Sequence, residues 1–147
     1  WSARTATDAM RSLWGGYAVL SPDCHWFFAG DTAYSKDFFD IRQHFAREHT
    51  PDQGGGFDIA LLPIGAYEPR WFMKDQHVNP EESVQIFKDI GCQRAFAVHW
   101  GTFQLTDEAL DEPPRALARA LHAQGMTSEQ FQVLAIGQTL RVPPRRR

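Results

Sequence analysis

The sequence predicts an α/β fold, because short apolar runs typical of strands alternate along the chain with segments of helical periodicity. Residues 58–64 and 94–98 are almost continuously apolar, as expected for strands that are buried on both faces of a sheet. Between them, residues 79–91 carry clear signals for the start and the end of a helix. The succession of strand, helix and strand is typical of the α/β class.

The first third of the chain adds a pair of strands and a helix. Residues 14–20 and 25–29 are expected to form an antiparallel hairpin, because a Ser-Pro-Asp turn signal separates them. After a loop at residues 30–34, a short helix is predicted from about residue 36 to residue 45. Its helical spacing is carried by Phe38, Ile41, Arg42 and Phe45.

The helix at residues 79–91 is the most strongly signalled element of the chain. Asn79 suits the N-cap, and Pro80 suits the first helical position. Gly91 can end the helix in a left-handed conformation. Apolar residues at helical spacing predict the buried face of this helix: Val84, Phe87 and Ile90.

The other segments after residue 64 have weaker signals. Residues 65–78 show no clear period and are predicted to form an ordered loop. A second helix is expected from about residue 113 to residue 124, with Gly125 at its end. Two short strands, near residues 131–134 and 139–142, are expected to close the fold.

Length and charge exclude several classes of function. The 147 residues can form one domain, and we expect residues 1–140 to belong to it, with residues 141–147 as a solvated basic tail. The net charge of −3 predicts no nucleic-acid partner. No apolar run is long enough to span a membrane. Two widely spaced cysteines, without a Cys-x-x-Cys pair, fit a reducing cytoplasm.

Polar side chains follow three of the predicted strands at the point where each strand ends. These are Asp31, the loop that contains His77, and His99. Ligands bind at the carboxyl ends of strands in α/β sheets, and a carboxylate with imidazoles suits zinc, iron or manganese. However, no two of the six histidines are spaced as His-x-His or His-x-x-x-His, so spacing alone leaves metal binding as one interpretation among others.

Each candidate also has a purely structural interpretation. Asp31 in Gly-Asp-Thr can be an Asx-turn residue, His99 can be a hydrogen-bonded core histidine, and His77 can be an ordinary loop residue. The neighbouring charged loop residues are by default solvated, and Trp71 fits either the core or the wall of a cleft. No serine elbow, phosphate-binding loop or dinucleotide-binding glycine pattern competes with the metal hypothesis.

Four stretches of the sequence resemble one known family. Residues 27–32, 63–74, 76–82 and 99–103 are similar to the N-acyl-phosphatidylethanolamine-hydrolysing phospholipase D family and its bacterial relatives, within the metallo-β-lactamase superfamily. The likeness runs from residue 1 to about residue 133. It implies an αββα sandwich with a binuclear zinc site at one edge of the two sheets, and it implies that this chain is the C-terminal half of that domain.

The resemblance also implies roles for individual residues. Asp31 matches the aspartate that bridges the metals, and His99 matches the last metal-binding histidine. His77 matches a catalytic histidine near the scissile group. The implied metal is zinc, with iron or manganese as alternatives. The loop residues that would shape the substrate cleft are Tyr67, Glu68, Arg70 and Trp71.

One departure from the family is large. Its His-x-His-x-Asp-His motif is absent, and a further histidine ligand would fall immediately before Trp1. We therefore expect an upstream segment of the same protein to supply the remaining ligands and to be needed for activity.

The expected function is zinc-dependent hydrolysis of phosphodiester, phospholipid-like, or related ester bonds by a metal-activated water. A small soluble ester or lactone is the alternative substrate. The expected location is the cytoplasm, with the membrane periphery as a second option. The alternative functions are a non-catalytic scaffold module of the same fold and a fragment that is inactive without its upstream half.

Overall fold

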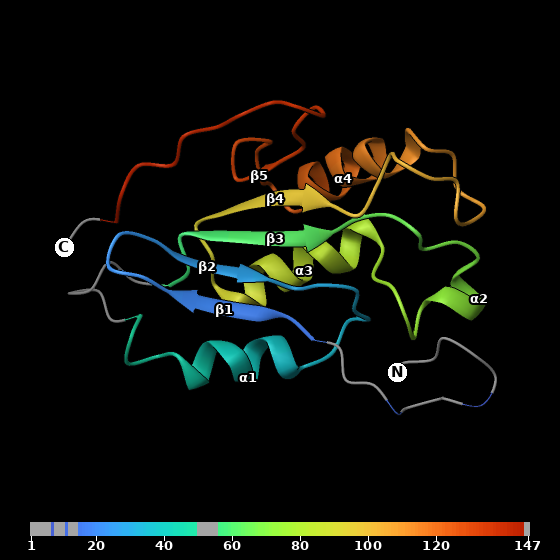
Figure 1. Cartoon of the computed structure of the whole chain (residues 1–147). Coiled ribbons are helices and arrows are strands. Elements are labelled where there is room, and N and C mark those ends of the chain that lie inside the picture. The colour runs from blue at the N-terminus through green and yellow to red at the C-terminus, as the bar shows by residue number, and fades with distance from the viewer. Residues whose placement is uncertain (1–6, 8–10, 12–14, 50–55, 146–147) are drawn as a thin grey trace.

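The computed structural model describes residues 7, 11, 15–49 and 56–145. Within these residues the strands form one five-stranded sheet in the order β1-β2-β3-β4-β5 (Figure 1). The strands are β1 (Tyr17–Leu20), β2 (His25–Phe28), β3 (Ile59–Pro63), β4 (Arg94–Val98) and β5 (Phe131–Gln132). The helices are α1 (Asp37–His44), α2 (Arg70–Met73), α3 (Pro80–Ile90) and α4 (Glu112–Ala123). The predicted α/β class is confirmed.

The pairing of the strands brings the ends of three of them to the same edge. β1 and β2 form the expected antiparallel hairpin, whereas β2, β3, β4 and β5 pair in parallel. The carboxyl ends of β2, β3 and β4 therefore lie side by side, at the end to which the arrowheads of β3 and β4 point in Figure 1.

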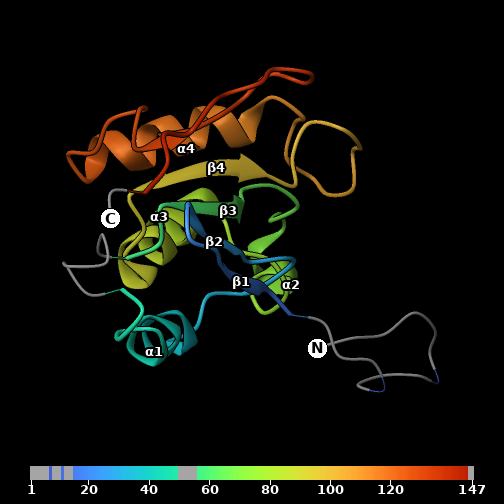
Figure 2. The ribbon, with the colours of Figure 1, turned by 60° about the vertical axis from the view of Figure 1, so that its left-hand side comes forward.

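The core lies between the sheet and the helices on one of its faces. α3 packs on β3 and contacts both α1 and α4, and Figure 2 shows these three helices on the same side of the sheet. Alternate residues of β3, Ala60 and Leu62, point into this core and are completely buried. The predicted buried face of α3 is confirmed, because Val84, Phe87 and Ile90 are all buried. Leu117, Ala120 and Leu121 form the buried face of α4.

The opposite face of the sheet carries an open apolar groove of about 480 Å³. Ile59 and Leu61, which alternate with the core residues of β3, line it together with Trp26 of β2. The C-terminal segment contributes Leu134, Leu140 and Val142 to its wall. An apolar sheet face of this kind is normally covered by another layer of protein.

Local signals placed α3 correctly. The Asn79 side chain accepts a hydrogen bond from the backbone N–H of Glu82, and the Glu82 carboxylate accepts one from the backbone N–H of Asn79. This capping box satisfies two amides at the start of the helix. Gly91 adopts the left-handed conformation with a φ of 68° and ends the helix as predicted.

Two predicted elements differ from the structure. Residues 65–78 contain the one-turn helix α2, which begins after Pro69 and is too short to show a period. The strand expected at residues 139–142 is wrong. The backbone turns at residues 135–138, where the Gln138 N–H donates to the Ala135 carbonyl, and then crosses the apolar face of the sheet without pairing to β5. Of the predicted strand 14–20, Trp14 lies outside the described residues.

The expectation of a fully solvated tail is wrong at Arg145. Its Nη1 donates to the Asp58 Oδ2 atom at 2.9 Å and to the Gly56 carbonyl oxygen, and its side chain is 4% exposed. Asp58 is itself buried and also accepts the backbone N–H of His25, so the buried carboxylate acquires a charged partner. Residues 146 and 147 lie outside the described part, and the division into residues 1–140 and 141–147 stays a prediction.

None of the helices in the described residues combines the length and the apolar composition that a membrane span requires.

Candidate metal centre

Asp31, His77 and His99 meet at the carboxyl edge of the parallel strands. Asp31 follows β2 through Gly30, whose φ of 68° permits the sharp turn. His99 directly follows β4, and His77 precedes the N-cap of α3. The loops of Asp31 and His77 are tied together, because the Val78 N–H donates to the Thr32 carbonyl oxygen at 2.9 Å.

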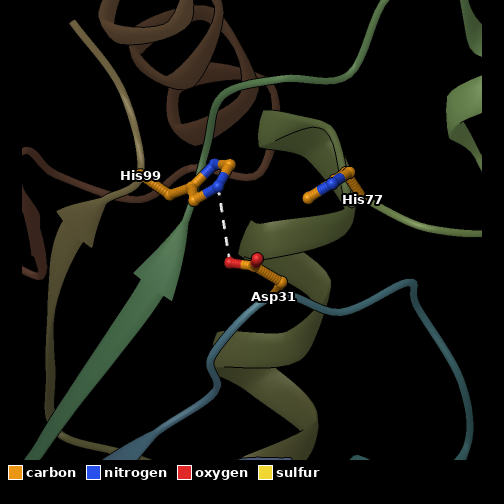
Figure 3. A group of neighbouring side chains, drawn as sticks. All are labelled: Asp31, His77 and His99. Carbon is orange, nitrogen blue, oxygen red and sulfur yellow. Dashed lines mark ion pairs between the residues drawn. The ribbon is translucent and has the colours of Figure 1, made fainter. Parts of the chain in front are cut away.

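The three side chains point toward a common space (Figure 3). One ligand atom from each residue lies within 4.8 Å of the others. The His99 Nε2 atom is 3.4 Å from the Asp31 Oδ1 atom, and the rings of His77 and His99 are stacked with centroids 5.1 Å apart. One carboxylate and two imidazoles at this separation form a ligand set that suits a divalent transition metal.

The electrostatics of the histidines also fit metal binding. Burial lowers the pKa of His77, and the nearby His99 lowers it further, although Asp31 acts in the opposite direction. His77 is therefore neutral near pH 7, the state in which an imidazole binds a metal. In the described residues, the Nδ1 atoms of His77 and His99 are buried without a hydrogen-bond partner, which leaves polar atoms that a ligand can satisfy.

The backbone near the candidate centre is strained at two positions. His99 has a φ of 59° and Ala66 has a φ of 62°, in the left-handed region that residues other than glycine rarely adopt. Both residues lie just beyond a parallel strand. Such conformations cost free energy and persist only where the surroundings fix them, which is common at functional sites.

The loop after β3 packs directly on the backbone of His99. A Cβ atom added to Gly65 would collide with the His99 carbonyl oxygen and would lie 3.2 Å from the Trp100 Cα atom. The Ile64 N–H donates to the Val98 carbonyl oxygen at 3.1 Å. The position of His99 therefore depends on the position of this neighbouring loop.

Four residues between β3 and α3 are predicted to contact the substrate, and this stays a prediction. Tyr67 is 6% exposed, and burial raises its pKa to about 12. The Glu68 carboxylate accepts the backbone N–H of Arg70. The Arg70 guanidinium donates to the His77 carbonyl oxygen at 2.9 Å and pairs with Glu82 at 2.8 Å. Trp71, by contrast, is 86% exposed.

Sequence reasoning missed Glu108, which lies in the connection between β4 and α4. Its carboxylate accepts three successive backbone N–H groups, from Ala66 at 2.6 Å, Tyr67 at 3.3 Å and Glu68 at 3.0 Å. The sequence holds no signal for this contact, because it joins residues about forty positions apart in a polar stretch.

A cleft of about 300 Å³ opens beside His99. Gly65 and Ala66 form one wall, and the connection from Trp100 to Leu110 forms the other. Phe103 and Leu105 of this connection are largely exposed, so the cleft is bordered by solvent-accessible apolar side chains. A space of this kind next to a ligand cluster is the usual form of a small-molecule site.

Relatives with known names share most of this chain. The chain is 36% identical over 122 residues to N-acyl-phosphatidylethanolamine-hydrolyzing phospholipase D 1 of Caenorhabditis elegans. It is 40% identical over 121 residues to the mitochondrial N-acyl-phosphatidylethanolamine-hydrolyzing phospholipase D of Saccharomyces cerevisiae. These matches cover 82% and 80% of this chain but only 32% and 24% of the two relatives. The chain thus spans a third or less of their length.

A solved structure supports the same fold. The isothiocyanate hydrolase from Delia radicum gut bacteria superimposes with a TM-score of 0.60 and 16% sequence identity, over 82% of this chain and 40% of that chain. Residues 1–100 match the family described as Beta-lactamase superfamily domain, which is more than half of the chain. The protein therefore belongs to the metallo-β-lactamase superfamily and, within it, is similar to the N-acyl-phosphatidylethanolamine-hydrolysing phospholipase D family.

Proposed function

We propose that this chain is part of a zinc-dependent hydrolase of phosphodiester, phospholipid-like, or related ester bonds. The observation that carries the proposal is the convergence of Asp31, His77 and His99 at the carboxyl edge of the parallel strands. The phospholipase names of the relatives support this class of reaction and substrate.

Each residue has a distinct part in the proposed mechanism. The Asp31 side chain is 56% exposed and would hold metal through its two carboxylate oxygens, and the more buried His99 would supply one directional nitrogen. A divalent metal held by these residues would lower the pKa of a bound water and polarise the scissile ester. His77, which is neutral near pH 7, would hold a substrate oxygen by a hydrogen bond as charge develops there. Zinc is the proposed metal, with iron or manganese as alternatives.

An upstream segment of the same protein is the proposed source of the remaining ligands. Two or three ligands from this chain are too few to close the coordination of a binuclear site. The relatives are about three times or more as long as the stretch they share with this chain. The apolar groove on the sheet supports the same idea, because a second layer placed there would bury Trp26, Ile59 and Leu61.

The proposed substrate has an apolar part that reaches the rim of the cleft. Phe103 and Leu105, which line the cleft, and Trp71 of α2 are all more than 60% exposed. We propose that Tyr67, Glu68 and Arg70, in the same segment as Trp71, also shape the substrate cleft. We propose a working location at the membrane periphery, where a phospholipid-like ester is available.

Removal of the metal tests the proposed function in the full-length protein. We expect the purified protein to hydrolyse N-acyl-phosphatidylethanolamine in mixed vesicles, to lose this activity after dialysis against a chelator, and to recover it with zinc. The measurement is the release of phosphatidic acid, with a lactone and a short phosphodiester as alternative substrates. Activity that survives complete removal of metal would contradict the proposal. Metal-loaded protein that cleaves none of the three substrates would favour the scaffold function.

A further inference from the structure

We propose that Glu108 is a positioning residue, which holds the loop at residues 65–68 against the backbone of His99 and so fixes the orientation of that ligand. The inference rests on the proposed metal centre. It concerns a residue that is not itself a ligand and that lies on a different segment of the chain. Glu108 would act on the metal centre through the backbone of the loop that it holds.

The contacts of Glu108 form a clamp on three successive amides. Its Oε1 atom accepts the N–H groups of Ala66 and Tyr67, and its Oε2 atom accepts the N–H of Glu68. Burial alone would raise the pKa of Glu108, but hydrogen bonds from the Thr106 side chain and from the backbone N–H groups of Glu68, Glu108 and Ala66 outweigh it and lower the pKa. The carboxylate is therefore charged near pH 7, and hydrogen bonds to a charged acceptor are stronger than neutral ones.

The segment that carries Glu108 is itself fixed. The Gln104 side-chain amide donates to the carbonyl oxygens of Thr106 at 3.0 Å and Glu108 at 2.7 Å. The Asp107 N–H donates in turn to the Glu68 carbonyl oxygen at 3.3 Å. The two loops are thus joined in both directions, and Glu108 cannot swing away without breaking several contacts.

The clamped loop touches the backbone of His99 and is linked to that of His77 through Arg70. At its start, Gly65 lies so close to the His99 carbonyl oxygen that there is no space for a Cβ atom. Beyond its end, the Arg70 guanidinium donates to the His77 carbonyl oxygen. Ala66, the first amide in the clamp, has the left-handed φ of 62° that the loop requires. Without Glu108, this residue would be expected to relax toward the negative φ that alanine prefers.

Replacement of the carboxylate by the isosteric amide tests the clamp. In Glu108→Gln the amide nitrogen cannot accept a hydrogen bond, so at least one of the three backbone N–H groups loses its partner. We expect the zinc dissociation constant of the full-length protein to rise by about 10- to 100-fold, as for other groups that orient a metal ligand. We also expect a shifted visible absorption spectrum in the cobalt-loaded protein, because this spectrum reports ligand geometry.

A metal-free measurement follows the loop itself. Hydrogen exchange of the amides at residues 66–68 is expected to be at least about ten times faster in Glu108→Gln than in the unsubstituted protein, because exchange follows local opening. The matched control is Asp111→Asn, which removes one nearby exposed carboxylate that pairs only with Arg115 among the described residues. This control should change neither the zinc dissociation constant, nor the cobalt absorption spectrum, nor the hydrogen exchange at residues 66–68. If Glu108→Gln does not fold, Thr106→Val removes one hydrogen bond to Glu108 and provides a milder test.

The outcomes separate this inference from the proposed function. Unsubstituted protein that binds no metal would contradict the proposed function. Unsubstituted protein that binds zinc, together with a Glu108→Gln variant of unchanged zinc affinity and cobalt spectrum, would overturn the positioning role alone. Faster exchange at residues 66–68 without any change in metal binding would also overturn it, because the clamp would then be purely structural.

Discussion

Replacement of Asp31 by Asn is expected to reduce the metal affinity and the turnover of the full-length protein by at least about 100-fold, and so to lower the metal retained after dialysis, since the loss of mere supporting groups costs 10- to 100-fold. Asn keeps the size of Asp31 but loses the negative charge and one ligand oxygen. In the unsubstituted protein, the Asp31 Oδ1 atom lies 3.4 Å from the His99 Nε2 atom, at the centre of the candidate ligand set. We expect little change in the free energy of unfolding, because the side chain is 56% exposed.

The same substitution separates the two interpretations of Asp31. An Asx-turn is formed as well by Asn as by Asp, so a purely structural role predicts unchanged metal content and activity. Elemental analysis after dialysis and initial rates measure the two quantities, and circular dichroism reports the fold. Asp40→Asn, an exposed acid in the first turn of α1, is the control for loss of one surface charge. Normal metal content in Asp31→Asn would refute the ligand role.

The second large effect is expected from Gly65→Ala. The added methyl group would meet the backbone of His99 and Trp100, neither of which can move away as a side-chain end can. We expect a loss of about 1–3 kcal/mol in the free energy of unfolding, as for other overpacked sites. Because the end of β4 must shift, we also expect the zinc affinity to fall by about 10-fold or more.

Denaturant unfolding and zinc titration measure these two consequences. The control is Gly15→Ala, because a Cβ atom at Gly15 has no heavy atom within 4 Å and its φ is not in the left-handed region. This variant should match the unsubstituted protein in both measurements. A Gly65→Ala variant that binds zinc normally would show that His99 does not depend on the loop after β3.

The parts of the fold that the sequence predicts well are those with local causes. α3 has its cap, its proline and its terminal glycine within one stretch of sequence, and each acts on the backbone next to it. β3 is apolar throughout and β4 is apolar apart from Arg94, because both faces of these strands are covered or lined by apolar groups. The missed elements depend on distant partners. Residues 139–142 look like a strand, but an edge strand needs a neighbour, and this segment crosses the sheet face instead.

The candidate site also has parts that the sequence predicts and parts that it does not. Asp31 and His99 are predictable as neighbours, because each follows a strand and the ends of parallel strands meet at one edge. Their metal-binding roles and the catalytic role of His77 came from the family resemblance and stay predictions. Glu108 was not predictable. Its partners are backbone amides that leave no trace in the pattern of side chains, and only the tertiary structure brings them together.

Anomalous diffraction from crystals of the full-length protein, measured at the absorption edge of the bound metal, tests the central claim most directly. We expect a peak within about 2.0–2.2 Å of an Asp31 carboxylate oxygen and of a His99 ring nitrogen. We also expect the remaining ligands to come from residues upstream of Trp1. A metal bound elsewhere, or protein that hydrolyses its substrate with no anomalous peak at this edge of the sheet, would contradict the account.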